Sequence, residues 1–415
     1  MFVIIINSCK LIGALKPKPY YMRIRFLTFL FVLLISNNIS AEINQRNLRT
    51  TQVYSTVLKE YRDLQVYLPN EYDSTYYSYP TIYLLDSEKN FTIGIEVLSF
   101  MMDNHFIPPH IIVGISNTDR FRDMTPVDTV MNKNIFPTRG GADNFIKALE
   151  SDIFPFLQKT FRLNSQRLVM GHNYSGLFVV YAFITKPELF DRFLAFSPIL
   201  WWNNDAIVND MQKFLQSKSS LRKHFFVSFA KEANNMLEAC KRLISVMNYN
   251  APVDLNWKYE WMPDEDHYSL YRKSLMKGMD NIFKDYKYPD VQYLASHGVE
   301  GVKLYQRKVL LNYGRNEKLP FSLLESVCLE LKNNGGVNDA LRFLNYTLLA
   351  YPQKADTYFY VGEIYEQKNM IQKAFRFYKI AHNKDKGRWD YEQKYMSVHK
   401  RLMDMNNKQT NNIKL

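Results

Sequence analysis

At 415 residues the chain exceeds one ordinary domain of roughly 100–200 residues, so its length predicts two folded units. Apolar residues make up 47% of the chain and aromatic residues 15%, which favours packed cores and excludes a disordered protein. The net charge of +12 invites a nucleic-acid interpretation, but the bases after residue 41 are scattered among acids and form no compact cluster. We therefore predict no nucleic-acid partner.

The first 41 residues have the pattern of an export leader. From Met22 they read MRIRFLTFLFVLLISNNISAEINQ, in which two arginines precede an apolar run over 26–35 and small residues follow it. The run is about half as long as the ~20 residues of a membrane-spanning helix, which favours cleavage after Ala41 over an anchor. We predict a leader over 1–41 with a signal peptide over 22–41, and a periplasmic or secreted protein without a stable membrane span. Met1 and Met22 both remain open as the start.

Between about residues 50 and 286, apolar β-type runs alternate with helical stretches, as in a mostly parallel sheet covered by helices. The predicted strands are 51–58, 63–68, 80–85, 110–115, 167–170, 193–196, 224–229 and 253–262. The predicted helices between them are 144–159, 176–185 and 235–247. This order predicts an α/β fold of the α/β-hydrolase type over 42–286.

The β-type runs stop near residue 286, and the remaining sequence is helical. VNDALRFLNYTLLAYP and IQKAFRFYKIAHNK superpose at an offset of 34 residues, the tetratricopeptide period, which places Ala340 over Ala374. We predict an all-α tetratricopeptide-like domain over 287–406 and a disordered tail over 407–415. Because fewer than about three repeats rarely fold alone, this domain is expected to pack on the hydrolase domain or to be extended by 296–311.

The most informative motif is GHNYSG at 171–176, between the predicted strand RLVM and the helix LFVVYAF. A nucleophile elbow of the form G-x-S-x-G occupies such a strand-to-helix turn and lifts its central side chain into the active site. Here the central residue is Asn173. The alternative is an ordinary βα turn that matches the motif by chance.

Several blocks around this motif carry a resemblance. In chain order they are YPTIYLLDSEKNF, IPPHIIVGISNTDRFRDMTP, GGADNFIKALESDIFPFL, FLAFSPILWW and DEDHYSL. Their order and spacing resemble the bacterial putative-esterase family, which is related to esterase D, feruloyl esterases and enterochelin esterases, over about residues 50–285. The resemblance implies an α/β-hydrolase acting on carboxylic esters, with His267 as the catalytic histidine. The acid is expected after HFFVSFA, where Glu232 stands, although a carboxylate at a helix start explains Glu232 equally well.

The resemblance also implies the rest of the site. Backbone amides of Tyr174 and of the turn containing Ser87 are expected to form the oxyanion hole. Arg120, Trp201 and Trp202 lie in its two most specific blocks and are candidate substrate-binding residues. An internal Arg–Asp latch is the alternative explanation for the arginine.

Asn173 decides how the chemistry is interpreted, because an amide nitrogen is a very poor nucleophile. Asparagine tolerates the positive φ of an elbow, so the geometry is expected to survive. Ser175 stands where the family has its second glycine, and its side chain is expected to face the strand–helix contact. We therefore predict a catalytically impaired ester hydrolase or a ligand- or protein-binding pseudoenzyme. The alternatives are an active hydrolase with a non-standard nucleophile and a tetratricopeptide-type scaffold.

Other chemistries have no motif in this sequence. The histidines lack metal-ligand spacing and neither GxGxxG nor GxxxxGK[ST] occurs, so we predict no metal and no cofactor. Three cysteines are too few for a disulfide framework, and two buried thiols are favoured over a Cys240–Cys328 bridge. The expected partners are a small-molecule ester, acyl-sugar or siderophore-like ligand and, through the helical tail, a protein.

Overall fold

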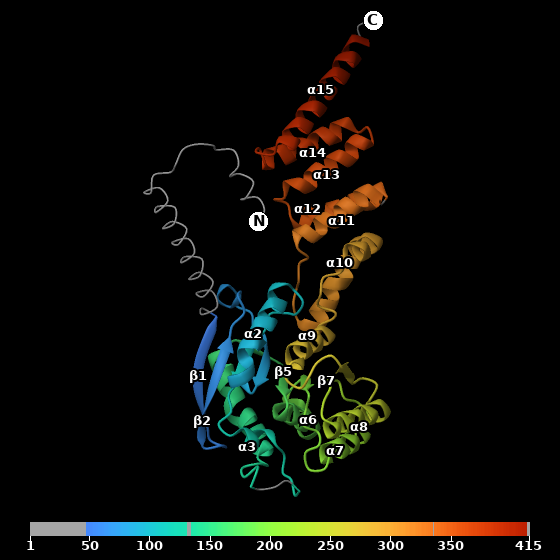
Figure 1. Ribbon diagram of the computed structural model, residues 1–415. Coiled ribbons are helices and arrows are strands. Elements are labelled where there is room, and N and C mark those ends of the chain that lie inside the picture. Colours follow the sequence, from blue (N-terminus) through green and yellow to red (C-terminus); the bar gives the residue numbers. More distant parts are fainter. Residues whose placement is uncertain (1–46, 131–133, 335, 413–415) are drawn as a thin grey trace, which may run out of the picture. The chain divides into compact units, whose positions relative to one another are not determined.

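The computed structural model describes residues 47–130, 134–334 and 336–412 (Figure 1). These residues form two compact units. The first comprises the described residues up to Asp103 together with Pro109–Ile282, and the second comprises Asn104–Pro108 and the described residues from Phe283 onward. The predicted leader over 1–41 lies outside the described residues.

The first unit contains one sheet of eight strands in the order β1-β2-β4-β3-β5-β6-β7-β8. β1 and β2 pair antiparallel, β2 and β4 pair antiparallel, and the other pairs are parallel. The strands are β1 Leu48–Ser55, β2 Glu60–Tyr67, β3 Tyr79–Leu85, β4 Ile111–Ile115, β5 Leu163–His172, β6 Arg192–Phe196, β7 His224–Ala230 and β8 Asn256–Met262. Each predicted strand overlaps one of them, and the predicted α/β-hydrolase fold is confirmed.

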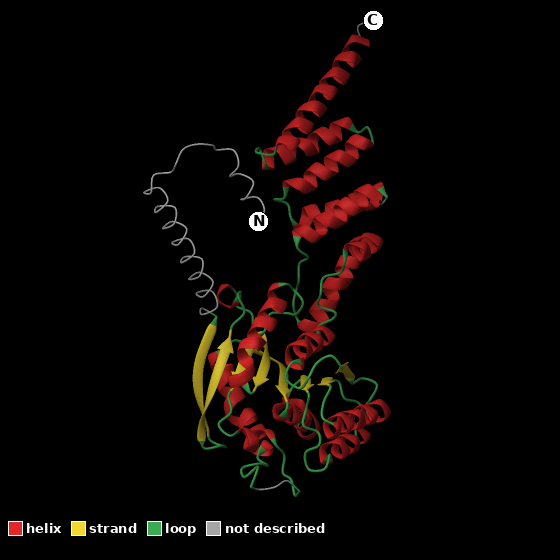
Figure 2. Ribbon diagram, viewed as in Figure 1, coloured by secondary structure: helices red, strands yellow, loops and turns green. Residues whose placement is uncertain are grey.

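The central strands are mostly apolar because both faces of the sheet are covered. Every residue of β4 and of β6 is buried, which is the pattern expected of parallel strands between two helix layers. Figure 2 shows the strands, in yellow, between two groups of helices. α2 and α9 pack on each other and on the sheet, while α6 contacts β5, β6, α3 and α7.

The helices of the first unit connect successive strands, except α9, which follows the last strand. Their bounds are α2 Ser87–Asp103, α3 Arg120–Met124, α4 Ala142–Ala148, α5 Phe154–Thr160, α6 Tyr174–Thr185, α7 Ala206–Gln216, α8 Asn234–Asn250 and α9 Leu270–Ile282. The helix predicted over 144–159 is divided, because a π-helical turn, Leu149–Ile153, separates α4 from α5. Pro155 has no N–H to donate to an α-helical bond, and the wider turn accommodates that loss.

The second unit is helical. Its helices are α10 Val291–Tyr313, α11 Phe321–Asn334, α12 Val337–Ala350, α13 Ala355–Gln367, α14 Ile371–Lys384 and α15 Trp389–Asn412. Consecutive helices pack on each other, and α10 also contacts α12 as α11 contacts α13. α12 and α14 contain the two segments of the sequence repeat, and Ala340 and Ala374 are both fully buried. α15 continues into the segment 407–415 that the sequence assigns to a disordered tail.

Cys240 and Cys328 are free, buried thiols, as the sequence favours. Burial raises the pKa of each thiol to about 12, so neither is a reactive thiolate near neutral pH. Within the described residues, no helix combines the length and apolarity that crossing a membrane requires.

Candidate active site

The candidate catalytic residues lie beyond the carboxyl ends of the strands, where open α/β sheets place their sites. Asp86 follows β3, Asn173 follows β5, Ser197 follows β6, Glu232 follows β7 and His267 follows β8. Because the strands from β3 to β8 are parallel neighbours in the sheet, these chain segments meet at one edge. The fold therefore brings together residues that are far apart in the sequence.

Asn173 forms a sharp turn between β5 and α6, with φ of 64° and ψ of −116°. The turn needs small neighbours. A Cβ added to Gly171 would lie 2.4 Å from the carbonyl oxygen of Ser175, and one added to Gly176 would lie 3.0 Å from that of Phe196. The positive φ expected at the centre of a nucleophile elbow is thus present, and asparagine is one of the residues that tolerate it.

The side-chain amide of Asn173 is held at both ends. Its Nδ2 lies 2.5 Å from Nε2 of His267, and its Oδ1 accepts the N–H of Tyr174 at 2.7 Å. A nucleophilic serine would offer its hydroxyl to the same imidazole nitrogen. Asn173 therefore occupies the nucleophile position and makes contact with both the base and the first expected oxyanion donor.

His267 is oriented by an acid on its other side. Its Nδ1 lies 3.0 Å from Oε2 of Glu232 and 2.9 Å from Oγ of Ser197, whose hydroxyl also donates to Oε1 of Glu232. The Glu232 side chain is only 2% exposed. Burial raises the pKa of this carboxyl, but hydrogen bonds from His267 and Ser197 outweigh that effect and hold the pKa below its usual value. Glu232 accepts a hydrogen bond from Nδ1, which directs the lone pair of Nε2 toward Asn173, as in a catalytic base.

His172 holds the chain segment of His267 in place through a hydrogen bond. Its Nε2 donates to the backbone oxygen of His267 at 2.7 Å, and the two rings lie 4.8 Å apart. Burial first, and the nearby charge of His267 second, lower the pKa of His172 to about 4. His172 was not predicted as a site residue, and the only signal for it in the sequence is its position next to the centre of the elbow.

Ser175 faces away from His267 and is fully buried. Its Oγ lies 2.8 Å from Oδ2 of Asp86 and 2.9 Å from the carbonyl oxygen of His172, and it accepts the N–H of His172 at 2.9 Å. Arg120 donates two hydrogen bonds to the same Asp86 carboxylate, from Nε at 2.9 Å and from Nη2 at 2.5 Å. Ser175 is therefore part of a closed hydrogen-bond cluster beneath the elbow, facing the strand–helix contact as expected.

The candidate substrate-binding residues differ in how exposed their side chains are. Trp202 is 1% exposed and donates its indole N–H to the carbonyl oxygen of Pro126 at 3.2 Å, so it is part of the core. Trp201 is partly buried beside it, with ring centroids 6.5 Å apart. Arg120 forms the Arg–Asp latch with Asp86, and its guanidinium lies 5.1 Å from the ring centroid of Tyr174. Only Trp201 and the exposed edge of Arg120 are open to a ligand in this arrangement.

The second expected oxyanion donor lies at the start of α2. Ser87 is the first residue of that helix, so its N–H belongs to the first turn, whose N–H groups have no partner within the helix. Its hydroxyl lies 2.8 Å from Oγ of Ser116. Asp86, just before it, has φ of 56°, which turns the chain sharply from β3 into α2.

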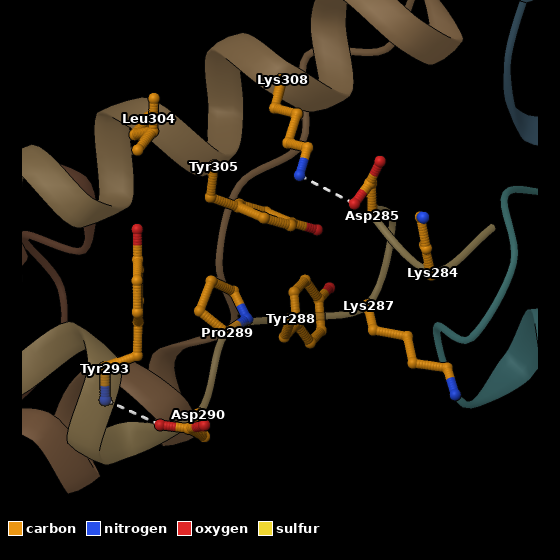
Figure 3. A pocket seen from close by; sticks show the side chains of 10 residues that line it. All are labelled: Lys284, Asp285, Lys287, Tyr288, Pro289, Asp290, Tyr293, Leu304, Tyr305 and Lys308. Carbon is orange, nitrogen blue, oxygen red and sulfur yellow. Dashed lines mark hydrogen bonds and ion pairs between the residues drawn. The ribbon is translucent and has the colours of Figure 1, made fainter. Parts of the chain in front are cut away.

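The second unit contains a pocket of about 390 Å³ (Figure 3). Lysine and tyrosine side chains dominate its lining, Lys308 pairs with Asp285 at 2.7 Å, and Asp290 accepts the N–H of Tyr293 at 2.7 Å. It contains none of the candidate catalytic residues. In the part of the chain that the structure describes, no group of three or more His, Cys, Asp or Glu residues is arranged to hold a metal ion.

The first unit thus has the fold and the carboxyl-edge site of an α/β-hydrolase. Residues 55–231 match the family model described as putative esterase. The match ends just before Glu232 and does not include His267. It confirms the resemblance at the level of an esterase-like family, and the first unit is an esterase-like α/β-hydrolase.

Two curated relatives extend the comparison. The ferri-bacillibactin esterase BesA of Bacillus subtilis is 30% identical over 155 residues, which are 33% of this chain and 53% of that protein. The siderophore triacetylfusarinine C esterase of Aspergillus fumigatus is 24% identical over 251 residues, which are 50% of this chain and 83% of that protein. The chain thus spans about half the length of the Bacillus relative.

Two solved structures are similar in fold. An IroE-like serine hydrolase from Shewanella oneidensis aligns with a TM-score of 0.60 at 23% identity, covering 72% of this chain and 98% of that one. An uncharacterised protein from Capnocytophaga ochracea aligns with a TM-score of 0.64 at 14% identity, covering 85% of this chain and 99% of that one. At these identities the likeness concerns the fold alone.

Proposed function

We propose that this chain is an exported, catalytically impaired homologue of esterase-type α/β-hydrolases that binds an ester ligand or a protein rather than turning esters over. The observation that carries the proposal is the amide of Asn173, which touches Nε2 of His267 where an attacking hydroxyl is required. Its lone pair is delocalised, so it cannot attack a carbonyl as a serine does. The impairment follows from one residue, because His267 and Glu232 keep the contacts of a base and its orienting acid.

Ser175 is a poor substitute nucleophile in this arrangement. Its hydroxyl is fully buried and engaged by Asp86 and by the backbone of His172. A nucleophile must reach both the base and a substrate carbonyl, and a side chain on the far side of the elbow reaches neither. These contacts support impairment over the alternative of a working enzyme with a different nucleophile.

The ligand class is taken from the relatives. Proteins named as siderophore esterases are similar to part of this chain, which supports a small-molecule ester, with acyl-sugar and siderophore-like compounds as the candidates. Carboxyl-edge sites of this kind retain their backbone donors when the nucleophile is lost. Export to the periplasm or the medium rests on the leader pattern over 1–41.

Turnover and labelling of the wild-type protein test the proposal. We expect hydrolysis of short activated esters near the uncatalysed rate and no adduct with a fluorophosphonate. A low residual rate agrees with impairment, because hydrolases without a complete triad keep roughly 10³–10⁴-fold acceleration over water. Turnover in the ordinary range of about 1–10³ s⁻¹ together with a fluorophosphonate adduct on Ser175 would make the proposal wrong.

A protein-binding role of the second unit is the other candidate function. It is supported by large apolar side chains that are exposed there, including Leu311 at 74%, Leu349 at 85% and Trp389 at 72%. These side chains lie on α10, α12 and α15, and helical repeat units often bind proteins through exposed side chains of successive helices. The tetratricopeptide assignment of residues 287–406 belongs to this proposal.

A further inference from the structure

Asn173 is itself a hydrolysable group placed among catalytic groups. Its side chain is a primary amide, with a carbonyl carbon Cγ between Oδ1 and Nδ2. Oδ1 receives the N–H of Tyr174 at 2.7 Å, and Nδ2 lies 2.5 Å from Nε2 of His267. Behind the imidazole, Oε2 of Glu232 lies 3.0 Å from Nδ1.

These contacts match those that a bound substrate makes during acyl transfer. The carbonyl oxygen lies at a backbone N–H of the kind that stabilises the negative oxygen of a tetrahedral intermediate. The leaving nitrogen lies beside an imidazole that can deliver a proton to it. Because the amide is covalently attached to the elbow, it is held there permanently and at high effective concentration.

We propose that His267 and Glu232 hydrolyse the side-chain amide of Asn173 and convert this residue into an aspartate. The co-reactant is water. Its oxygen bonds to Cγ while Nε2 of His267 takes one of its protons, and the carbonyl electron pair moves to Oδ1, next to the N–H of Tyr174. The Cγ–Nδ2 bond then breaks, the imidazolium returns the proton to nitrogen, and ammonia leaves. The new carboxyl group gives its proton to ammonia, so the products are a carboxylate and ammonium.

The local geometry opposes the usual route of asparagine deamidation. In that route the backbone nitrogen of the next residue attacks Cγ and forms a cyclic imide, which opens to normal and β-linked aspartate. In this structure the backbone N–H of Tyr174 instead donates to Oδ1 of Asn173, and Tyr174 is the first residue of α6. Direct hydrolysis by water therefore yields normally linked aspartate only.

The conversion changes what the elbow can do. A carboxylate is one of the groups that enzymes use as a nucleophile, whereas an amide is not. The modified chain carries such a group beside His267, so Asn173 is a latent nucleophile made by the site's own base and acid. The inference rests on the proposed function only in taking His267 and Glu232 as a working base and acid.

Mass spectrometry of the peptide containing Asn173 tests this inference. Freshly purified full-length protein is incubated at neutral pH in water enriched in the heavy oxygen isotope and digested at intervals. We expect the NH2 group to be exchanged for one heavy-oxygen hydroxyl, with normal linkage, roughly 10²-fold faster than at Asn204. Asn204 is the matched control because it is exposed and has φ of 53°, without a catalytic pair beside it.

Variants separate catalysis from strain. His267→Gln should abolish the conversion and Glu232→Gln should slow it, with circular dichroism showing that each variant is folded. The Asn173→Asp variant supplies the chromatographic standard for the modified peptide.

An unmodified Asn173, a mixture containing β-linked aspartate, or an unchanged rate in both variants would overturn the inference. Ester turnover by Asn173→Ser tests the base and acid independently. A gain there with an intact wild-type amide therefore refutes the self-hydrolysis and leaves the proposed function standing.

Discussion

Two positions of the same elbow, residues 173 and 175, differ in a way that explains the site. Asn173 points toward His267 but carries an amide. Ser175 carries a hydroxyl, but this hydroxyl is buried and hydrogen-bonded to Asp86. A hydroxyl is thus present within two residues of the catalytic position and cannot be used there. The comparison teaches that the direction of a side chain at the turn, and not the presence of serine in the motif, defines a nucleophile.

The structure also gives Ser175 a reason to be there. Ser175 stands where the family has its second glycine, and its hydroxyl fits between Asp86 and the backbone of His172. Removing it would leave the buried carboxylate of Asp86 with one donor fewer. We therefore expect Asn173→Ser alone to restore chemistry better than Asn173→Ser combined with Ser175→Gly.

The largest expected effect comes from Asn173→Ser. The new hydroxyl lies beside Nε2 of His267, and we expect hydrolysis of short activated esters to rise by roughly 10²–10⁴-fold over wild type. Steady-state kinetics and a fluorophosphonate adduct on residue 173 are the measurements. Asn173→Ala is the matched control, and adding His267→Gln should remove the gain. A natively folded Asn173→Ser variant without any gain would show that the site has lost more than its nucleophile.

The second expected effect concerns the latch beneath the elbow. Arg120→Ala removes the positively charged partner of Asp86, whose side chain is 1% exposed, and a buried carboxylate without a countercharge should lower the free energy of unfolding by about 3 kcal/mol. Arg242→Ala is the control, because Arg242 pairs with Asp205 on the surface, with side chains 50% and 28% exposed, and should cost below about 1 kcal/mol. Urea unfolding followed by fluorescence compares the two. Equal losses would contradict a structural role for the latch.

The strands and the elbow could be predicted from the sequence because their signals are local. Long apolar runs give the strands, and small residues around Asn173 give the turn. The divided helix at Leu149–Ile153 was missed because the apolar spacing runs through it, although Pro155 was a local sign.

The partners within the site were harder to predict because they depend on tertiary contacts. Ser197 reaches both Glu232 and His267 only because β6 and β7 are neighbours in the sheet. The grouping of Asn104–Pro108 with the second unit likewise depends on contacts distant in the sequence, such as His105 stacked 3.8 Å from Tyr288. Trp202 was predicted to bind a ligand only because it lies in the SPILWW block, but the surrounding residues bury its ring in the core.

Ser175→Ala tests the buried hydroxyl of the elbow, with a smaller expected loss of stability than Arg120→Ala. It removes a buried donor to Asp86, which should lower the free energy of unfolding by about 2 kcal/mol and leave the low ester turnover of the wild type unchanged. Ser220→Ala is the control, because Ser220 donates to Asp254 at the surface at 2.5 Å and its loss should cost less than about 1 kcal/mol. A fall in ester turnover in Ser175→Ala would instead favour Ser175 as a working nucleophile.

The smallest expected effect is a pH dependence at the elbow. His172 has a pKa of about 4 in the folded protein, below the ordinary value of 6.5, because burial disfavours its charged form. Between about pH 4 and pH 6.5, His172 is therefore protonated in the unfolded chain but not in the folded protein. The contribution to stability is complete above about pH 6.5 and is lost as the pH falls toward 4.

Between about pH 7 and about pH 5.5, the loss from His172 should be about 1 kcal/mol. Urea unfolding of the wild type at the two pH values, compared with His172→Asn, measures it as the difference in pH dependence. His297→Asn, at an exposed histidine, should behave as the wild type does. If His172→Asn also keeps the wild-type pH dependence, another group titrates. The bond from His172 to the backbone of His267 would then hold the catalytic segment without making it sensitive to acid.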